Sequence, residues 1–268
     1  MVQPEDIVGN SRTIGYKVQR FVCIPQEVAL MAERVWDPFL SERDRIRAGL
    51  EPAPRKGVGK KPALLMVDLY RWAFGDAPEP LLDAIKTWPG SCGLAGWEAL
   101  PHIERLLGEA RALAVPVLHI TGSPDVPGWR DATPRGGRRE DPATLARLQR
   151  RYDIMESVAP IDGEVVLRKS APSAFWGTSL IGHLVGLGVD TLVIAGESTS
   201  GCVRATVVDG KSHRFKVVVP EPCVFDRDEA SHAINLYDID QKYADVLPLE
   251  ETLGYLRSVA PDGVAAAG

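Results

Sequence analysis

The sequence has few cysteines, no long apolar segment and no excess of positive charge. The four cysteines, Cys23, Cys92, Cys202 and Cys223, are scattered without the spacing of a zinc site or a disulfide framework. No apolar run approaches the length of a membrane span, and a net charge of −5 gives no electrostatic footprint for nucleic acid. We therefore expect neither a membrane nor a nucleic-acid partner, and a reducing, cytoplasmic location.

No internal repeat is visible, and since nothing resembles a signal peptide we expect none. With 268 residues, of which 45% are hydrophobic, the chain can bury one large core. Segments typical of strands alternate with segments typical of helices along the chain, which favours a single α/β domain.

The alternation predicts a layered fold. Strands are expected over 63–67, 116–120, 165–167, 192–195, 216–219 and 246–248. Helices are expected over 81–86, 97–113, 142–152, 178–187, 202–212, 228–237 and 250–259. Because crossovers between parallel strands are right-handed, we predict a Rossmann-like three-layer sandwich with a parallel sheet of order 3-2-1-4-5-6. This order puts the first and fourth strands side by side.

Residues 1–60 have the composition of a helical N-terminal extension and linker ahead of a domain at 61–268. Segments 25–36 and 40–48 favour helices, and 51–61 is rich in proline, glycine and lysine. We expect this extension to pack on its own domain or on a neighbouring subunit.

The most informative stretch is 193–206, where an apolar run ends in small residues and a cysteine. Residues 192–195 predict a buried strand, 196–201 a tight turn and 202–212 a helix. The sulfur of Cys202 would then lie in the first helical turn, where the helix dipole and unpaired N–H groups favour a thiolate. A structural cysteine packed behind a strand is the alternative for this residue taken alone.

Two other charged residues follow strand-like runs. Asp68 ends the apolar run 63–67, and Lys169 follows the short run 165–167. In open α/β sheets, ligands bind at the carboxyl ends of the strands, so these residues are candidates for one site with Cys202. Taken singly, Asp68 is equally well a turn or helix cap, and Lys169 a solvated surface charge.

Several motifs give the sequence its resemblance to a known family. They are K-S-A-P-S-A-F at 169–175, G-T-S-L at 177–180, T-S-G-C-V-R-A-T at 199–206, C-V-F-D-R at 223–227, S-H at 231–232 and K-Y-A-D-V at 242–246. From about residue 61 to residue 246 the sequence resembles the isochorismatase-like cysteine hydrolases, and within them the branch of N-carbamoylsarcosine and maleamate amidohydrolases. The resemblance implies a catalytic triad of Asp68, Lys169 and Cys202.

The resemblance also implies a cis peptide bond between Glu197 and Ser198, and a homo-oligomer, expected to be a tetramer. We expect the backbone N–H groups of Ser198 and Cys202 to form an oxyanion hole. The related nicotinamidases bind a metal through an Asp-x-His pair that this sequence lacks. We therefore expect no metal and no cofactor. Glu197 is an unusual residue for such a turn. If its carboxylate is buried it must be paired, since otherwise it would raise the pKa of the cysteine.

Five residues are candidates for substrate binding. Arg227 follows the fifth strand, where the branch supplies an arginine for a substrate carboxylate; a salt bridge to Asp226 or Asp228 is the alternative. Trp72, Phe74 and Trp176 follow the catalytic segments closely enough to be pocket walls, although such aromatics are more often core residues. Thr199, in the nucleophile turn, completes the set.

These observations predict a cofactor-independent cysteine amidohydrolase that cleaves a small linear amide or carbamoyl substrate. The reaction would pass through a thioester and release ammonia. If Arg227 has the role that the branch implies, the substrate also carries a carboxylate. Two alternatives stay open. One is a vinyl-ether hydrolase of the isochorismatase type, against which Cys202 argues because those enzymes lack the nucleophilic cysteine. The other is a catalytically silent oligomeric binding protein on the same fold.

Overall fold

The computed structural model describes residues 34–123 and 142–260. The helix expected over 25–36 falls almost entirely outside these residues, and the described part of it, 34–36, is not helical. All the candidate site residues that the sequence singled out, from Asp68 to Arg227, lie within the described ranges.

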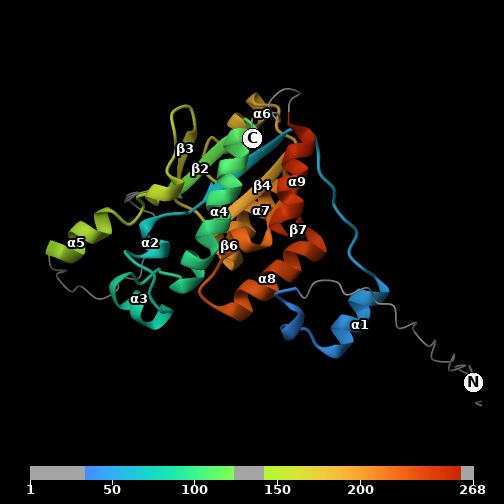
Figure 1. Ribbon diagram of the computed structural model, residues 1–268, viewed down its shortest axis with the longest axis horizontal. Helices are drawn as coiled ribbons and strands as arrows, with labels where there is room; N and C mark the ends of the chain where they lie inside the picture. The colour runs from blue at the N-terminus through green and yellow to red at the C-terminus, as the bar shows by residue number, and fades with distance from the viewer. Residues whose placement is uncertain (1–33, 124–141, 261–268) are drawn as a thin grey trace, which may run out of the picture. The chain divides into compact units, whose positions relative to one another are not determined.

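One parallel sheet forms the centre of the described chain (Figure 1). Its strands are β1 (Pro62–Val67), β2 (Val117–Gly122), β3 (Val165–Lys169), β4 (Thr191–Glu197), β5 (Lys216–Pro220), β6 (Val224–Phe225) and β7 (Asp245–Leu247). The strand order is β3-β2-β1-β4-β5-β7, with β6 paired to β4. The expected order is confirmed, since β7 is the expected sixth strand. The short β6, which has two residues, was not predicted.

Helices cover both faces of this sheet, which confirms the three-layer architecture. One face packs against α2 (Arg71–Phe74), α4 (Leu94–Ala112) and α9 (Leu249–Val259). The other face packs against α6 (Leu180–Gly186), α7 (Arg204–Ser212) and α8 (Glu229–Lys242). The remaining described α-helices are α1 (Glu42–Leu50), α3 (Leu81–Thr87) and α5 (Pro142–Gln149).

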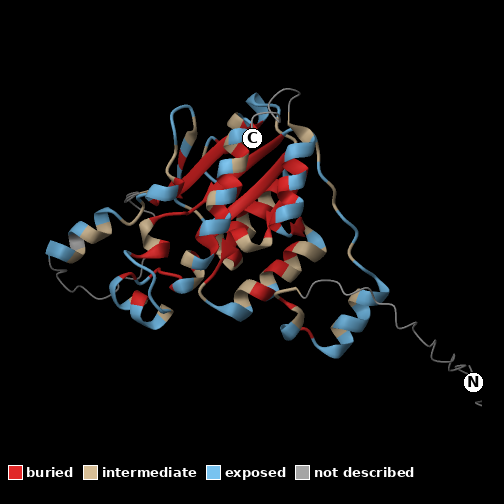
Figure 2. Cartoon of the chain, in the orientation of Figure 1, coloured by how far each residue is buried: buried red, intermediate tan, exposed pale blue. Residues whose placement is uncertain are grey.

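The central strands are apolar throughout because both of their faces are covered. Every residue of β1 and β4 is buried, as Figure 2 shows for the middle of the sheet. Along β1, Leu64 and Met66 contribute to the core beneath α4, and Leu65 and Val67 to the core beneath α7. A strand that packs on both sides lacks alternation and reads as a continuous hydrophobic run. This is why the sequence located these two strands.

The described part of the extension, residues 35–60, belongs to the same compact unit as the sheet. Trp36 is buried and its ring lies edge-on to Tyr237 of α8, with 6.1 Å between the ring centroids. Further along, the backbone N–H groups of Lys56 and Gly57 both donate to the carboxylate of Asp245, each at 2.8 Å. These residues therefore pack on their own domain, which is one of the two arrangements that the sequence left open.

Removing residues 1–60 is expected to destabilise the protein. The truncation deletes Trp36, which is buried against α8, and the two backbone N–H groups that donate to Asp245. Loss of one buried large side chain and its contacts corresponds to a decrease of about 5 °C or more in Tm for a domain of this size. Differential scanning calorimetry of the truncated and full-length chains measures this, and an equal Tm would contradict the structural role given to residues 35–60.

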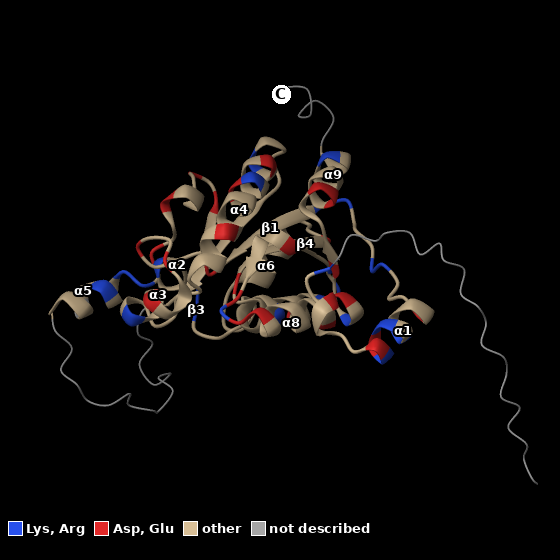
Figure 3. Cartoon of the chain, turned by 60° about the horizontal axis from the view of Figure 1, so that its bottom comes forward, with Lys and Arg blue, Asp and Glu red and all other residues tan. Residues whose placement is uncertain are grey.

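Charges of both signs are distributed over the outer helices (Figure 3). Between α4 and α9, Arg257 Nε donates to Glu109 at 2.6 Å and Arg105 pairs with Glu250. Such exposed pairs contribute little stability, and both helices share an apolar core with the sheet.

Candidate active site

Asp68, Lys169 and Cys202 come from three different strands of the sheet. Asp68 directly follows β1, Lys169 is the last residue of β3, and Cys202 lies in the turn after β4. Because β2 separates β3 from β1, the long Lys169 side chain spans the end of β2 to reach Asp68. The carboxyl ends of these strands lie at one edge of the sheet, which is where open α/β folds place their ligands.

The ammonium group of Lys169 joins the other two side chains. Its Nζ lies 2.7 Å from Oδ2 of Asp68 and donates to Sγ of Cys202 at 3.2 Å. It also donates to the carbonyl oxygen of Ala171 at 3.2 Å. Asp68 is fully buried and Lys169 is 7% exposed, whereas Cys202 is only partly buried. The sulfur is therefore the member of this cluster most open to a substrate.

The backbone at Asp68 has an uncommon conformation. Its φ is 55°, in the left-handed region that only a few per cent of non-glycine residues adopt and that aspartate tolerates better than most. The Asp68 N–H donates to the carbonyl oxygen of Ile120 at 2.8 Å, and its own carbonyl accepts from Tyr70 at 3.0 Å. These two bonds fix the turn that carries the carboxylate.

Burial and a neighbouring charge at Cys202 oppose the thiolate that a helix dipole and unpaired N–H groups would favour. Burial, together with the negative charge of Asp68, raises the pKa of the Cys202 thiol to about 12, although Lys169 acts in the opposite direction. In the structure, Cys202 lies in a π-helical turn (Thr199–Val203) that precedes α7, not in the first turn of an α-helix. This environment favours the thiol over the thiolate.

Asp68 is the carboxylate that acts most strongly on this thiol. Burial raises the pKa of Asp68, and the positive charge of Lys169 only partly offsets this effect. A carboxylate with a raised pKa is a stronger base than an exposed aspartate. The pKa of Lys169 is also raised, because attraction to Asp68 and Cys202 outweighs its burial. Lys169 thus stays a cation.

The turn after β4 has a second distinctive backbone feature, since the Glu197–Ser198 peptide bond is cis. Gly196 precedes it with a φ of 125°, and a Cβ atom there would lie 1.8 Å from the carbonyl oxygen of Val67. Only glycine permits this close approach of β4 to β1. The next residues are held by side chains, because the Ser200 N–H donates to Asp226 Oδ2 at 2.7 Å.

Arg227 lies near this turn, with its side chain 35% exposed. Its Nε and Nη2 donate to the carbonyl oxygen of Gly90 at 3.1 and 2.5 Å. The guanidinium also faces Glu197, with Nη2 3.9 Å from Oε2. The sequence left open a salt bridge from Arg227 to Asp226 or Asp228. Among the described residues neither pair forms, and the carboxylate that faces the guanidinium is that of Glu197.

The other expected substrate-binding residues are placed unequally. Trp72 is partly buried, and its indole lies so close to Gly90 that a Cβ at that glycine would fall 1.6 Å from Nε1. Trp176 is 53% exposed, on the segment that follows Lys169. Both remain candidates for walls of a substrate pocket.

Phe74 and Thr199 lie in the interior, which for Phe74 is the core position that the sequence left open. Phe74 is fully buried in the core, edge-on to Trp97 and Phe225. Thr199 is also fully buried, and its hydroxyl lies 2.8 Å from Nδ1 of His232. The expectation for these two rested on sequence proximity to catalytic segments, which does not determine the direction of a side chain.

Sequence reasoning missed some residues around the cluster. Tyr70 is buried beside it, and burial together with Asp68, Glu197 and Cys202 raises its pKa well above that of an ordinary tyrosine. Gly90, whose carbonyl receives Arg227, has no side chain that could signal such a contact. The distance of two residues between Asp68 and Tyr70 was the one available clue.

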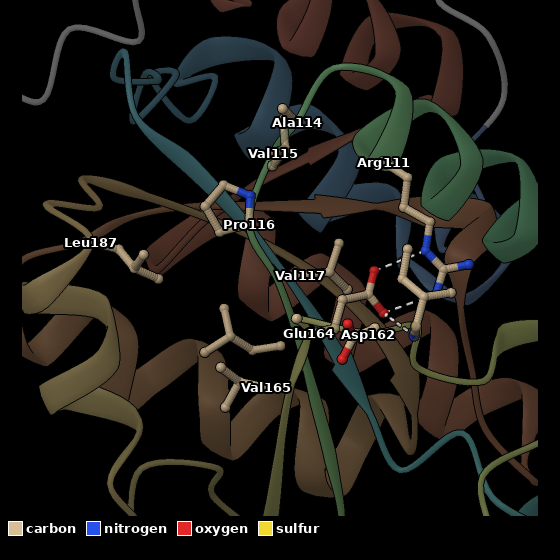
Figure 4. Close-up of a pocket in the computed structure, with 12 residues that line it drawn as sticks. Arg111, Ala114, Val115, Pro116, Val117, Asp162, Glu164, Val165 and Leu187 are labelled. Carbon is tan, nitrogen blue, oxygen red and sulfur yellow. Dashed lines mark hydrogen bonds and ion pairs between the residues drawn. The ribbon is translucent and has the colours of Figure 1, made fainter.

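A cavity of about 320 Å³ lies at the amino-terminal ends of β2 and β3, opposite the ends that carry the candidate site (Figure 4). Val117 and Val165, the first residues of β2 and β3, line it. At its rim, Glu164 accepts hydrogen bonds from Arg111 at 2.8 Å and faces Nε2 of His119 at 2.8 Å. Because Asp68 and Lys169 lie at the other ends of their strands, this cavity is separate from the catalytic cluster.

Within residues 34–123 and 142–260, no group of three or more histidine, cysteine or acidic side chains has an arrangement that could hold a metal ion. His119 is buried against Glu164 and Arg111. Over the same residues, none of the helices has the length and hydropathy needed to cross a bilayer.

The chain matches a known family profile and several related proteins. The isochorismatase domain profile matches residues 88–251, a range that includes Lys169 and Cys202. Maleamate amidohydrolase of Pseudomonas putida is 38% identical over 210 residues, which are 77% of this chain and 92% of that protein. N-carbamoylsarcosine amidase of an Arthrobacter species is 33% identical over 213 residues, covering 75% of this chain and 74% of the relative.

Solved structures show the same fold. A cysteine hydrolase from Pseudomonas syringae pv. phaseolicola superimposes with a TM-score of 0.63 at 20% identity, covering 78% of this chain and 99% of the other. N-carbamoylsarcosine amidase from Thermoplasma acidophilum superimposes with a TM-score of 0.53 at 24% identity, covering 71% and 97%. The resemblance noted in the sequence is confirmed, and the chain belongs to the isochorismatase family.

Proposed function

We propose that this protein is a cysteine-dependent amidohydrolase that cleaves a small linear amide or N-carbamoyl substrate and releases ammonia. The observation that carries the proposal is the position of Lys169 Nζ, which contacts both the Asp68 carboxylate and the Cys202 sulfur. The names of two relatives, an amidohydrolase and an amidase, support a hydrolase that acts on carbon–nitrogen bonds outside peptides.

The first half of the reaction forms a thioester. As the sulfur attacks the carbonyl carbon, the thiol proton moves to Asp68, because a thiol with a pKa of about 12 does not ionise alone at neutral pH. The charge of Lys169 stabilises the developing thiolate. The carbon–nitrogen bond then breaks, the proton held by Asp68 passes to the nitrogen, and ammonia leaves.

The second half hydrolyses the thioester. A water molecule attacks the acyl carbon while Asp68 accepts its proton, and the carbon–sulfur bond breaks as the proton returns to Cys202. We assign the oxyanion hole to the backbone N–H groups of Ser198 and Cys202, which flank the turn after β4. Removing one such donor typically costs about 100- to 1000-fold in rate.

Ammonia release from a panel of linear amides and ureido acids tests the proposal. Maleamate, the substrate named for one relative, and N-carbamoylsarcosine, named for another, are the first compounds to assay. A vinyl-ether hydrolase would instead release no ammonia from any of them. A silent binding protein would bind one of these compounds in calorimetric titration without releasing ammonia from it.

We further propose that Arg227 binds a carboxylate of the substrate. Within the described residues, Nη1 of Arg227 takes part in no hydrogen bond, so one edge of the guanidinium can receive an anion while Nε and Nη2 hold Gly90. Trp72, packed on the same Gly90, is the proposed neighbouring wall, and Trp176 the wall beside Lys169.

Arg227→Lys is expected to raise KM for maleamate roughly 10- to 100-fold, because a lysine keeps the charge but loses the planar fork. Maleamide, in which a neutral amide replaces the carboxylate, should be much less affected. Arg204→Lys is the matched control, since Arg204 pairs with Asn235 and Asp238 between α7 and α8. Steady-state kinetics with both compounds measure the effect, and equal losses on acid and diamide would indicate a structural arginine.

The proposal includes a cytoplasmic homotetramer, which is the assembly that the resemblance in the sequence implies. Cys92, Cys202 and Cys223 are free thiols, which suits a reducing compartment. Analytical ultracentrifugation of the full chain gives the mass of the assembly directly.

A further inference from the structure

The carboxyl group of Glu197 is buried beside the proposed substrate anchor. Glu197 is the last residue of β4, and its side chain is 5% exposed. Its Oε2 accepts a hydrogen bond from Sγ of Cys92 at 3.7 Å and lies 3.9 Å from Nη2 of Arg227. A carboxylate rarely occupies such a position without a role, because burial of a charge is costly.

Glu197 does not anchor Arg227 mechanically. The carbonyl oxygen of Gly90 holds the guanidinium with two hydrogen bonds, whereas the 3.9 Å separation from Glu197 is too long for one. Glu197 therefore acts on Arg227 through its charge. Because Glu197 is buried, its charge is screened less than a surface charge, and at this distance it changes how strongly the partly exposed guanidinium attracts a second anion.

Groups from several elements act on Glu197. They are Asp68 and Tyr70 after β1, Cys92 before α4, Lys169 at the end of β3, Cys202 in the nucleophile turn, and Asp226 and Arg227 after β6. Burial and the charge of Asp68 raise the pKa of Glu197 to about 8, and Arg227 partly opposes them. Both the neutral and the ionised form are thus accessible close to neutral pH.

We propose that Glu197 is a specificity-determining residue that acts through Arg227. When protonated, Glu197 leaves the positive charge of Arg227 available to a substrate carboxylate. When ionised, it neutralises that charge and repels the incoming anion. This inference rests on the proposed function, and in particular on the assignment of Arg227 as the carboxylate site.

The inference predicts a pH dependence that separates acid from neutral substrates. As the pH rises from 7 to 9, Glu197 ionises, and KM for maleamate should increase roughly tenfold, within the usual range of coupling between two sites. KM for maleamide should not follow this increase, because a neutral amide makes no ion pair with Arg227. Because Glu197 also acts on Asp68 and Cys202, its ionisation changes kcat for both substrates alike, and the effect specific to the acid is expected in KM.

Glu197→Gln tests the assignment, because glutamine keeps the shape and cannot ionise. In this variant, KM for maleamate should become independent of pH between 7 and 9. Asp228→Asn is the matched control, since Asp228 is a carboxylate next to Arg227 in the chain but exposed, and it should keep the rise. A Glu197→Gln enzyme that retains the acid-specific rise would overturn the inference.

A second measurement needs no change at Glu197. Calorimetric titration of Cys202→Ala with maleamate, in buffers of different ionisation enthalpy, measures the protons taken up on binding. A bound carboxylate should favour the protonated form of Glu197, so net proton uptake is expected near pH 8. Binding without proton uptake would overturn the inference. Failure of the wild-type enzyme to release ammonia from any amide would instead contradict the proposed function.

Discussion

Replacing Cys202 with alanine should reduce ammonia release at least about a thousandfold, because no other group in the cluster can form the covalent intermediate. Substrate binding should persist. The side chain removed is small, and the proposed carboxylate anchor, Arg227, is held independently by Gly90. Ammonia assays give the rate and calorimetric titration gives Kd for the same variant.

Cys223→Ala is the matched control for this substitution. Cys223 is a fully buried thiol in the core beneath α4, without a polar partner in the catalytic cluster. Its removal should lower the stability of the protein but leave kcat near the wild-type value. Retention of more than a few per cent of activity by Cys202→Ala would exclude covalent catalysis by this residue.

Asp68→Asn is expected to be almost as damaging, since the amide cannot accept the thiol proton. The wild-type enzyme should lose kcat/KM as the pH falls and Asp68 becomes protonated. Because burial raises the pKa of Asp68, the midpoint of this loss should lie above the pKa of an ordinary aspartate. The pH profile of kcat/KM, measured where the fold is intact by circular dichroism, tests the assignment. Lys169→Ala should be comparably inactive.

The control for Asp68→Asn is Asp245→Asn. Asp245 is also a buried carboxylate, but it binds the backbone of Lys56 and Gly57 rather than the catalytic cluster. Its substitution should lower Tm and leave the pH profile unchanged. An acid limb that survives in Asp68→Asn, with substantial turnover, would assign the base to another group.

The sequence located the strands that carry the site because β1 and β4 are buried on both faces. A run without polar interruption, followed at once by Asp68 or by the turn to Cys202, predicts a strand end and a functional group together. The strand order then followed from right-handed crossovers. It places β1 against β4, and Val67 pairs with Gly196 in the observed register.

What the sequence could not predict depends on the direction and burial of side chains. The pKa of Cys202 rises because the thiol is buried beside Asp68, an effect that helix position alone does not report. Phe74 turns into the core, and Arg227 binds a backbone carbonyl that no residue type signals. The strand β6 has two residues and contributes too short a pattern to detect.

The central claim is that Cys202 carries the acyl group during turnover. Intact-mass spectrometry of enzyme mixed with maleamate and quenched in acid within milliseconds tests it directly. We predict an added mass equal to the substrate minus ammonia, located on the peptide that contains Cys202 and absent from Cys202→Ala. Turnover of maleamate with no such adduct at any quench time, under conditions where a synthetic thioester survives, would contradict the account.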